Sequence, residues 1–462
     1  MSTKVSIVGM GKLGSSMAAA FADKGFNVIG VDINPESVDN INRGIPPVEE
    51  TGLVDLFVKN STRLRATLNL EEAILGSDIS FVVVPTPSLP DGGFSLEYVR
   101  TAFSAIAKAL SQKSEYHLVV LTSTVLPGST SQILLPLLAS ESGKEPGSDF
   151  GLCYSPEFIA LGSIVRDFLN PDFTLIGELD DRSGRALEEL YQGVVENGAP
   201  SARMSLENAE LAKLAVNTFV TTKIAFANML ASICERLPGG DVDVVSHALG
   251  MDTRIGRKYL TGALGYGGPC FPRDNAALSQ LAQSLGINAS LSEATDAMNR
   301  SRVSLLVRDI ESQLTPESTV AVLGLAYKPD SYVTEESQGL EMAEYFSNRG
   351  FEVLAYDPLS KSMIHQFSDW NFTVMESVWE CIDRADIVIV STPDPCFATL
   401  NEEDFCGGSG TKVVYDAWRI LRKLEGSENV EYFAIGLGRS LEEDASEFRS
   451  IGGRLESIGA SV

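Results

Sequence analysis

The chain has 462 residues and carries 36 Lys+Arg against 62 Asp+Glu, a formal net charge of −26. This length allows two or three domains with a large core. The negative charge excludes nucleic acid and anionic membrane as expected partners. Six cysteines without a CxxC pair and three histidines indicate neither a zinc site nor a disulfide framework, so no metal is expected.

The first strand is predicted to begin by about Lys4, which leaves no room for a signal peptide. We find no apolar run of about 18 residues, the length that a membrane span requires. Cysteine usage of this kind fits a reducing compartment. We therefore expect a cytoplasmic protein with no membrane partner.

A dinucleotide-binding turn is predicted near the start of the chain. A strand over residues 5–8 leads into the sequence GMGKLG at 9–14, a helix over 15–24 and a strand over 27–31 that ends at Asp32. Glycines let backbone N–H groups approach a pyrophosphate at a helix N-terminus, and an acid at this place accepts ribose hydroxyls, which favours NAD over NADP. A turn without a ligand is the alternative, but the strand, turn and helix in order favour NAD. The predicted cofactor residues here are Gly9, Gly11, Lys12, Leu13, Gly14 and Asp32.

Two further strands, over 79–84 and 118–121, are followed by polar loops that contain Pro85, Thr86 and Thr124. Both loops would lie at carboxyl ends of strands, where open α/β sheets bind ligands. Taken alone, each loop is equally compatible with an ordinary connection.

One long helix is predicted over residues 205–236, which contain no glycine or proline. At about 1.5 Å per residue it would be roughly 45 to 50 Å long. Lys213, Asn217 and Asn228 fall within an arc of roughly 60° on it, at 100° per residue. The surrounding positions are apolar, so this polar line needs partners. A second long helix is predicted over about 292–313.

The last third of the chain repeats the first. Residues 350–358 resemble 25–32, and 385–393 resemble 77–87. We predict an α/β fold with two Rossmann-like doubly wound domains, at 1–204 and 313–462, joined by a helical domain at 205–312. The segment 320–329 has lost two of the three fingerprint glycines and has gained Lys328, which predicts a different phosphate ligand; solvated surface is the alternative for this lysine.

The loop GYGGPCFPRD at 265–274 presents Cys270 among glycines, with Asp274 four residues on. A thiol held in this way can act as a nucleophile. The alternative is a buried structural cysteine, which the polar, glycine-rich sequence disfavours. Together with the dinucleotide fingerprint, the loop predicts hydride transfer with a covalent thiol step.

Seven motifs in order make the chain resemble the nucleotide-sugar 6-dehydrogenases, the family of UDP-glucose, GDP-mannose and UDP-N-acetylhexosamine dehydrogenases. The motifs are 9–14, 84–87, 123–125, 155–158, Lys213 with Asn217, 265–274 and 326–330. The resemblance implies an NAD-dependent oxidoreductase that oxidises a sugar C6 alcohol to a carboxylate in two steps. It also implies that Cys270 carries a thiohemiacetal and then a thioester.

The resemblance assigns roles to further residues. Lys213 and Asn217 would stabilise an oxyanion, Glu157 would assist the hydrolytic water, and Thr124 and Asp274 would help to hold that water. A turn acid is the alternative reading of Glu157. The cofactor set also includes Pro85, Thr86 and Thr124. The predicted substrate set is Phe158, Ile159, Lys213, Asn217, Tyr266, Gly267, Phe271, Lys328 and Arg419.

The chain departs from the family pattern in three places. Glu335 stands where many members have an arginine, and Trp418 stands where the arginine of an Asp-x-Arg motif is expected, with Arg419 next to it. After Glu157, an Ala-Leu pair at 160–161 replaces the usual Arg-Glu.

The expected activity is oxidation of UDP-glucose to UDP-glucuronate, a polysaccharide precursor. The alternatives are a UDP-N-acetylhexosamine or GDP-mannose dehydrogenase, a single-step β-hydroxyacid dehydrogenase, and a catalytically silent nucleotide-sugar-binding protein. The resemblance also implies a homodimer, or a higher homo-oligomer, formed through the long helix.

Overall fold

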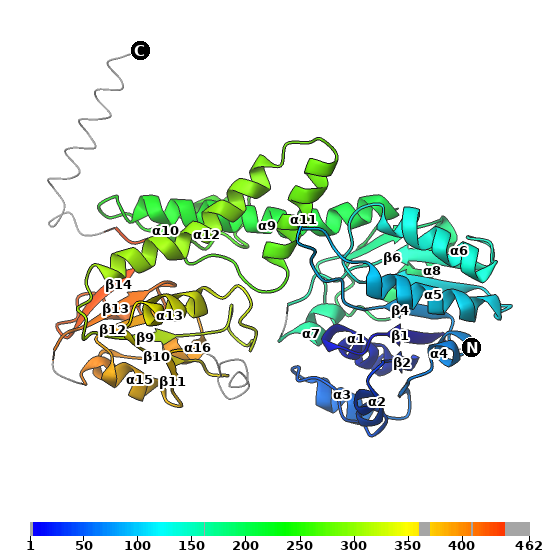
Figure 1. Cartoon of the computed structure of the whole chain (residues 1–462), viewed down its shortest axis with the longest axis horizontal. Coiled ribbons are helices and arrows are strands. Elements are labelled where there is room, and N and C mark those ends of the chain that lie inside the picture. Colours follow the sequence, from blue (N-terminus) through cyan, green and yellow to red (C-terminus); the bar gives the residue numbers. More distant parts are fainter. Residues whose placement is uncertain (1–2, 161, 360–369, 408–409, 439–462) are drawn as a thin grey trace, which may run out of the picture. The chain divides into compact units, whose positions relative to one another are not determined.

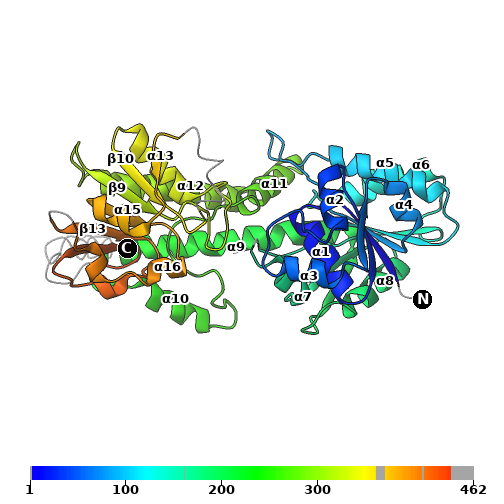
Figure 2. The same cartoon turned by 90° about the horizontal axis from the view of Figure 1, so that it is seen from below.

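The computed structural model describes residues 3–160, 162–359, 370–407 and 410–438 (Figure 1). The chain divides into two compact units, Met1–Val216 and Asn217–Val462. The division falls inside helix α9 (Leu206–Cys234), which is one continuous helix (Figure 2). The two units are described separately.

The first unit contains an eight-stranded sheet in the order β3-β2-β1-β4-β5-β6-β7-β8. All neighbouring strands are parallel except β6 and β7. The strands are β1 (Lys4–Val8), β2 (Asn27–Val31), β3 (Leu64–Thr67), β4 (Ile79–Val82), β5 (His117–Leu121), β6 (Phe150–Tyr154), β7 (Thr174–Glu178) and β8 (Ser201–Ser205). The strand order reverses between β1 and β4, and a ligand crevice is expected at the carboxyl ends there.

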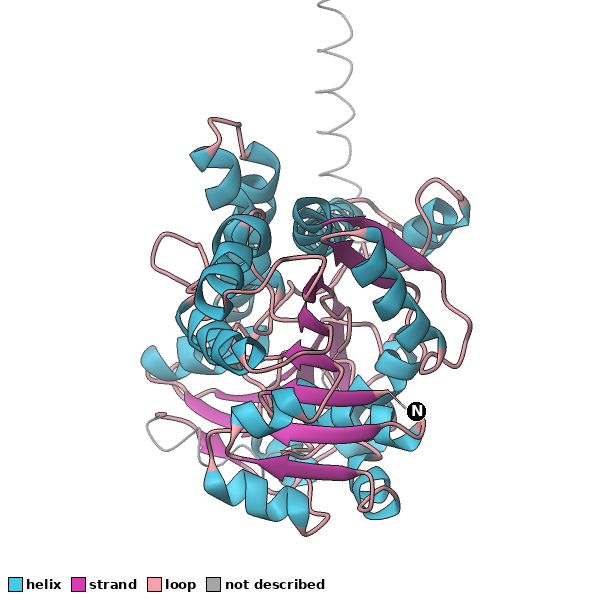
Figure 3. Ribbon diagram, turned by 90° about the vertical axis from the view of Figure 1, so that its right-hand side faces the viewer, coloured by secondary structure: helices cyan, strands magenta, loops and turns pink. Residues whose placement is uncertain are grey.

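Helices cover both faces of this sheet (Figure 3), and a separate hydrophobic core lies on each face. This is why the central strands β1, β4 and β5 are buried along almost their whole length rather than at alternate residues. The helices are α1 (Lys12–Asp23), α2 (Pro35–Asn42), α3 (Leu53–Lys59), α4 (Leu70–Leu75), α5 (Glu97–Ser111), the π-helix η1 (Ser129–Leu134), α6 (Leu135–Ser142), α7 (Ile164–Leu169) and α8 (Asp181–Gln192).

The second unit contains a six-stranded sheet in the order β11-β10-β9-β12-β13-β14, parallel throughout. The strands are β9 (Thr319–Leu323), β10 (Glu352–Tyr356), β11 (Thr373–Val374), β12 (Ile387–Val390), β13 (Lys412–Asp416) and β14 (Val430–Ala434). The helices are α10 (Val242–Met251), α11 (Phe271–Ser284), α12 (Ser290–Glu311), α13 (Gln338–Asn348), α15 (Val378–Arg384), α16 (Pro395–Ala398), η3 (Glu402–Phe405) and η4 (Arg422–Leu424).

The two predicted Rossmann-like sheets and the helical middle region are therefore confirmed. The long helix predicted over 205–236 is α9, and the one predicted over 292–313 is α12. The domain boundaries after residues 204 and 312 stay predictions, because the two compact units part within α9.

Among the described residues, α9 alone is long and apolar enough to cross a membrane by length and composition. The expectation that no segment meets this criterion is wrong. The same test is passed by core helices of soluble proteins, and 39% of the most apolar window of α9 is buried inside the protein. The polar face of α9 is also bonded within the protein, since Asn228 pairs with the backbone of Ala263 and Leu264.

Candidate active site

The turn between β1 and α1 is shaped by two glycines that no larger residue could replace. Gly9 has a φ of +99°, and a Cβ on it would collide with the carbonyl oxygen of Val83. A Cβ on Gly14 would collide with the carbonyl oxygen of Gly9. At Gly11 a Cβ would meet nothing within 4 Å, so open space lies over the middle of the turn.

Helix α1 begins at this turn without a side-chain cap. The first N–H groups of a helix have no intrahelical partner and suit a pyrophosphate. Asp32, at the end of β2, accepts the Met10 N–H (2.9 Å) and the Asn34 N–H (2.9 Å), which fixes its carboxylate beside the turn. Residues 9–14 and Asp32 therefore fit NAD, with the amides placed for its phosphates and the acid for a ribose.

The loops after β4 and β5 are tied to each other. Thr86 Oγ1 donates to the carbonyl of Thr124 (2.8 Å), and Ser123 Oγ accepts from the N–H of Val84 (3.0 Å). The structure thus brings the predicted Thr86 and Thr124 together, whereas Pro85, directly before Thr86, is exposed. Motif reasoning missed Glu210 of α9, which is fully buried.

Glu210 supports the loop that follows Thr124. Its carboxylate accepts the N–H groups of Gly128 (2.6 Å) and Thr130 (2.8 Å) at the start of η1. Burial raises the pKa of this carboxyl, and the hydrogen bonds oppose that shift. No local sequence pattern identifies Glu210, because its two partners lie 82 and 80 residues back along the chain.

Glu157 follows β6 and lies beside Lys213 of α9. Lys213 Nζ donates to the backbone carbonyl of Glu157 (2.6 Å) and lies 4.5 Å from the centroid of the Phe158 ring. Burial raises the pKa of the Glu157 carboxyl to about 7, against the opposing charge of Lys213. Three predicted residues are thus assembled in the first unit, and Ile159 continues the same loop, partly buried.

In the second unit, Asn217 and Asp274 form a buried pair. Asn217 Nδ2 donates to Asp274 Oδ2 at 2.6 Å, and Asp274 is 1% exposed. Because Lys213 and Asn217 are four residues apart in one helix, their side chains leave α9 on the same face. The carboxylate therefore orients a predicted catalytic amide.

Cys270 is exposed and is the N-cap of α11, with Asp274 in the first turn. The N–H of Asp274 donates to the carbonyl of Cys270 at 2.9 Å. A helix N-terminus favours negative charge, so this position suits a thiolate nucleophile. The structure therefore joins Cys270, Asp274 and Asn217 in one constellation.

The loop that carries Cys270 is clamped at Tyr266. The Tyr266 N–H donates to Asn299 Oδ1 (2.8 Å), and its carbonyl accepts from Asn299 Nδ2 (2.9 Å) and Gln338 Nε2 (2.9 Å). The Tyr266 hydroxyl donates to Asp296 (2.5 Å) and accepts from Asn275 (2.9 Å). All of these contacts are with other residues of the protein, so they fix the position of the loop. A contact between Tyr266 and the substrate stays a prediction.

The same loop packs on the loops that follow β9. The Gly268 N–H donates to the carbonyl of Glu335 (2.9 Å), and a Cβ on Gly267 would collide with the carbonyl of Glu336. Glu335 therefore serves this contact through its backbone. Lys328 Nζ lies 5.9 Å from the centroid of the Tyr327 ring, in the adjoining segment.

Phe271 makes edge-to-face contacts with Tyr259 and Tyr266, at centroid separations of 6.4 and 6.3 Å. These contacts place Phe271 within an aromatic cluster at the start of α11. The roles of Phe271, Gly267 and Lys328 in substrate binding stay predictions.

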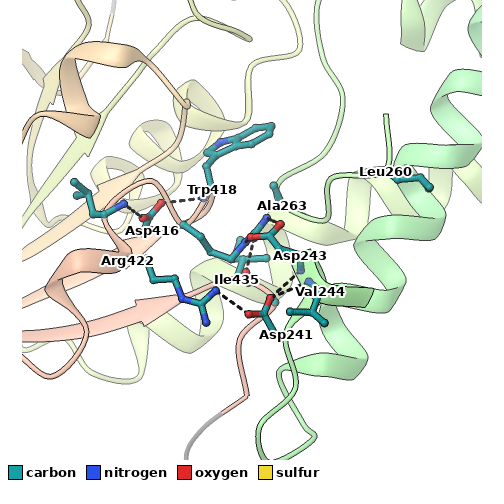
Figure 4. Close-up of polar contacts among 12 residues, drawn as sticks. Asp241, Asp243, Val244, Leu260, Ala263, Asp416, Trp418, Arg422 and Ile435 are labelled. Carbon is teal, nitrogen blue, oxygen red and sulfur yellow. Dashed lines mark hydrogen bonds and ion pairs between the residues drawn. The ribbon is translucent and has the colours of Figure 1, made fainter. Parts of the chain in front are cut away.

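Arg419 lies in a network around the N-terminus of α10, part of which Figure 4 shows. Its Nε and Nη2 pair with the Asp243 carboxylate (2.7 and 3.0 Å), and its Nη1 donates to the carbonyl of Ile435 (2.6 Å). Arg422 pairs with Asp241 beside it (2.7 Å). The side chain of Arg419 is 2% exposed and joins α10 to the sheet of the second unit. A substrate contact from Arg419 stays a prediction.

Comparison with known proteins covers nearly the whole chain. Residues 3–195 match the NAD binding domain of the UDP-glucose/GDP-mannose dehydrogenase family, 207–301 its central domain and 321–423 its UDP binding domain. The UDP-glucose 6-dehydrogenase AglM of Haloferax volcanii is 34% identical over 92% of this chain and 98% of its own. The GDP-mannose 6-dehydrogenase of Azotobacter vinelandii is 32% identical over 87% of this chain and 94% of its own.

Among solved structures, a UDP-glucose dehydrogenase from Pyrobaculum islandicum has a TM-score of 0.85 at 34% identity, covering 95% of this chain and 98% of that one. The predicted family, the oxidoreductase class and the NAD cofactor are all confirmed by these matches. The chain belongs to the UDP-glucose/GDP-mannose dehydrogenase family and is an NAD-dependent nucleotide-sugar 6-dehydrogenase.

Proposed function

We propose that the protein oxidises the C6 hydroxyl of UDP-glucose to a carboxylate, in two steps, through a covalent bond to Cys270. The observation that carries this proposal is the exposed thiol of Cys270 at the start of α11, next to the buried Asn217–Asp274 pair. A single oxidation of an alcohol needs no such nucleophile, whereas an aldehyde yields a second hydride only after a nucleophile has made its carbon tetrahedral.

NAD, when bound, accepts one hydride in each oxidation. In the first step the C6 alcohol loses a hydride and its hydroxyl proton and becomes an aldehyde. Cys270 Sγ then bonds to C6, and the aldehyde oxygen takes a proton, which gives a thiohemiacetal. The loss of a second hydride and the hydroxyl proton gives a thioester. Water adds to that carbon, the C–S bond breaks, and the sugar carboxylate and the thiol are released.

Polar groups of the chain would serve these steps in turn. The Lys213 ammonium and the Asn217 amide are hydrogen-bond donors on one face of α9, suited to the oxygen that gains negative charge. Glu157 would take the proton of the attacking water, and a carboxyl whose pKa is about 7 is matched to that task at neutral pH.

Replacement of the nucleophile tests the covalent step. Cys270→Ser should lower carboxylate formation by at least about a hundredfold while UDP-glucose binding persists, measured by product mass and calorimetric titration. Cys406→Ser is the matched control. The Cys406 thiol is also exposed, but it lies at the end of η3 and outside the loop that carries Cys270. Undiminished carboxylate formation in Cys270→Ser would disprove the covalent mechanism.

The sugar nucleotide is tested with a panel of UDP-glucose, GDP-mannose and UDP-N-acetylhexosamines, with kcat/KM read from NADH absorbance. The panel spans these sugars because the similar proteins include both UDP-glucose and GDP-mannose dehydrogenases. Two NADH per sugar support the proposal. One NADH would indicate a single-step β-hydroxyacid dehydrogenase, and tight binding without NADH would indicate a silent binding protein.

We also propose a homodimer formed through α9. One stripe of this helix exposes Phe219 (65%), Phe226 (46%), Met229 (39%) and Ile233 (47%), and an apolar stripe of this kind is costly in water unless it is covered. A second copy can cover it isologously. Sedimentation of Phe219→Glu should show a monomer, and an unchanged mass would exclude this interface.

We further propose that the protein acts in the cytoplasm, where its thiols stay reduced. None of the cysteines, all of which lie in the described residues, forms a disulfide, which fits a reducing compartment. Cell fractionation tests this proposal, and recovery of the protein from an oxidising compartment would contradict it.

A further inference from the structure

A chain of hydroxyl groups runs from the sheet of the first unit to Glu157. Ser155 Oγ donates to the carbonyl of Leu175 on β7 (2.9 Å) and lies 2.8 Å from the hydroxyl of Tyr191 on α8. The Tyr191 hydroxyl lies 3.5 Å from Glu157 Oε1, the longest link of the chain. Ser155 and Tyr191 are 1% and 3% exposed, so water does not replace these partners.

The protons of this chain can be counted. A backbone carbonyl only accepts, so the single proton of Ser155 is used on Leu175. The Ser155 oxygen must then accept the proton of Tyr191. A donation from the Tyr191 hydroxyl to Glu157 Oε1 would leave the contact with Ser155 or that with Leu175 without a proton. With both of those contacts made, Tyr191 keeps only lone pairs for Glu157, so the link is complete only when Glu157 Oε1 carries a proton.

We propose that Ser155 and Tyr191 are positioning residues that stabilise the neutral acid form of Glu157 and so set the pH above which Glu157 can take a proton from the hydrolytic water. The proposal rests on the role given to Glu157 in the proposed function. It adds a fixed direction of hydrogen bonding that no sequence motif contains.

The other groups that face this carboxyl act in known directions. Lys213 of α9 favours the ionised form by its charge, and burial favours the neutral form. The buried thiol of Cys153 on β6 lies near the Tyr191 hydroxyl. Burial raises the pKa of Glu157 to about 7 against the charge of Lys213, and a hydrogen bond donated by Tyr191 would lower this pKa. The proton count of the hydroxyl chain excludes that donation and so favours the neutral acid further.

Infrared difference spectroscopy of the full-length enzyme gives a test, with the Glu157 band identified by its loss in Glu157→Gln. In Tyr191→Phe the neutral acid loses its acceptor, so the pKa of Glu157 should fall by about half to one unit. In Ser155→Ala the Tyr191 proton becomes free to donate to the carboxylate, so the pKa should fall further. The acid limb of thioester hydrolysis in single turnover should move by the same amounts.

Tyr116→Phe is the control. Tyr116 is a partly buried tyrosine of the first unit that does not belong to this hydroxyl chain, so its replacement should leave the band unmoved. A raised pKa in Tyr191→Phe would show that Tyr191 donates to an ionised Glu157 and would overturn the proposal, as would an unchanged pKa. Ser155→Ala keeps the test decisive if Tyr191→Phe fails to fold. The infrared titration needs no turnover, so a failure of the cysteine mechanism would be seen separately.

Discussion

The two Rossmann-like sheets differ most at the turn after their first strand. In the first, α1 begins at Lys12, directly after the glycine turn, and has no side-chain cap. In the second, the turn after β9 leads into a long loop, and α13 begins only at Gln338, where Ser337 caps it. The first turn therefore leads directly into the N–H groups of α1. The second turn reaches α13 only through that loop, although Gly339 of α13 packs against the carbonyl of Gly324 as Gly14 packs against that of Gly9.

The acids that end the second strand of each sheet make the difference clearer. Asp32 accepts one amide of its turn, that of Met10. Asp357 accepts two, those of Leu325 (2.8 Å) and Ala326 (3.0 Å), and is 4% exposed. The same residue type at the same position thus leaves one turn open for an anion and fills the other with its own carboxylate. A fold shared by two domains does not carry its ligand with it.

At the opposite edge the sheets are alike. Lys113 Nζ donates to the carbonyl of Ile74 near the end of α4 (2.8 Å), and Lys412 Nζ donates to the carbonyl of Asp383 near the end of α15 (2.9 Å). A cation stabilises a helix C-terminus. The two domains therefore have the same lysine contact at their helix C-termini, and they differ at the turn after the first strand, where a ligand would bind.

The largest effect is expected from Gly14→Ala. Its Cβ would collide with the Gly9 carbonyl, so the turn must open, at a cost of about 1–3 kcal/mol in unfolding free energy. The dissociation constant of NAD should rise at least about tenfold, measured by calorimetry. Gly11→Ala, in open space, should keep the unfolding temperature. Unchanged NAD affinity in Gly14→Ala would contradict a cofactor turn that depends on close backbone approach.

Glu157→Gln should increase the free energy of unfolding at high pH, because the ionised Glu157 carboxylate destabilises the folded protein. The folded pKa of about 7 lies above the ordinary value of 4.5, so the folded state binds the extra proton between these pH values, and the free energy of unfolding falls as pH rises through them. The variant should match the parent near pH 4 and be more stable by about 1–3 kcal/mol at pH 8, measured by denaturant titration. Glu189→Gln, at an exposed position of α8, should show no such trend. A variant less stable than the parent at pH 8 would refute this account.

Asp357→Asn tests the filled turn of the second sheet. A neutral amide is a weaker acceptor for the two buried N–H groups, so unfolding should become easier by about 2 kcal/mol with NAD affinity unchanged. Asp32→Asn should do the reverse, with weaker NAD binding and little change in stability. Thermal denaturation measures the stability of both variants, and NAD titration measures their affinity for the cofactor. If both variants changed stability and NAD affinity in the same way, the two turns would not differ in function.

The smallest effect is expected from Lys328→Ala, which tests the prediction that this lysine binds a phosphate of the nucleotide sugar. Loss of one partly exposed cation should raise KM for the nucleotide sugar about fivefold, or about 1 kcal/mol, with KM for NAD unchanged. Lys423→Ala is a control at an exposed position. An equal rise of both KM values would remove Lys328 from the nucleotide-sugar site.

Local pattern was sufficient for the elements and for the motifs. The apolar runs of β1 and β2 and the helical periodicity of α9 follow from side chains a few residues apart, and so does the glycine turn that fits NAD. Residue spacing on α9 was also enough to place Lys213 and Asn217 on one face. These features depend on near neighbours, which the sequence displays directly.

Tertiary structure alone decided the partners of the polar groups. Tyr191 looks like an ordinary core aromatic of an amphipathic helix, yet its hydroxyl faces Glu157, 34 residues away. Arg419 resembles a substrate ligand, yet it meets Asp243, 176 residues away. Buried donors and acceptors must form hydrogen bonds with whatever groups the fold brings beside them. A contact between residues so distant along the chain produces no periodic pattern in the sequence, so it could not be predicted.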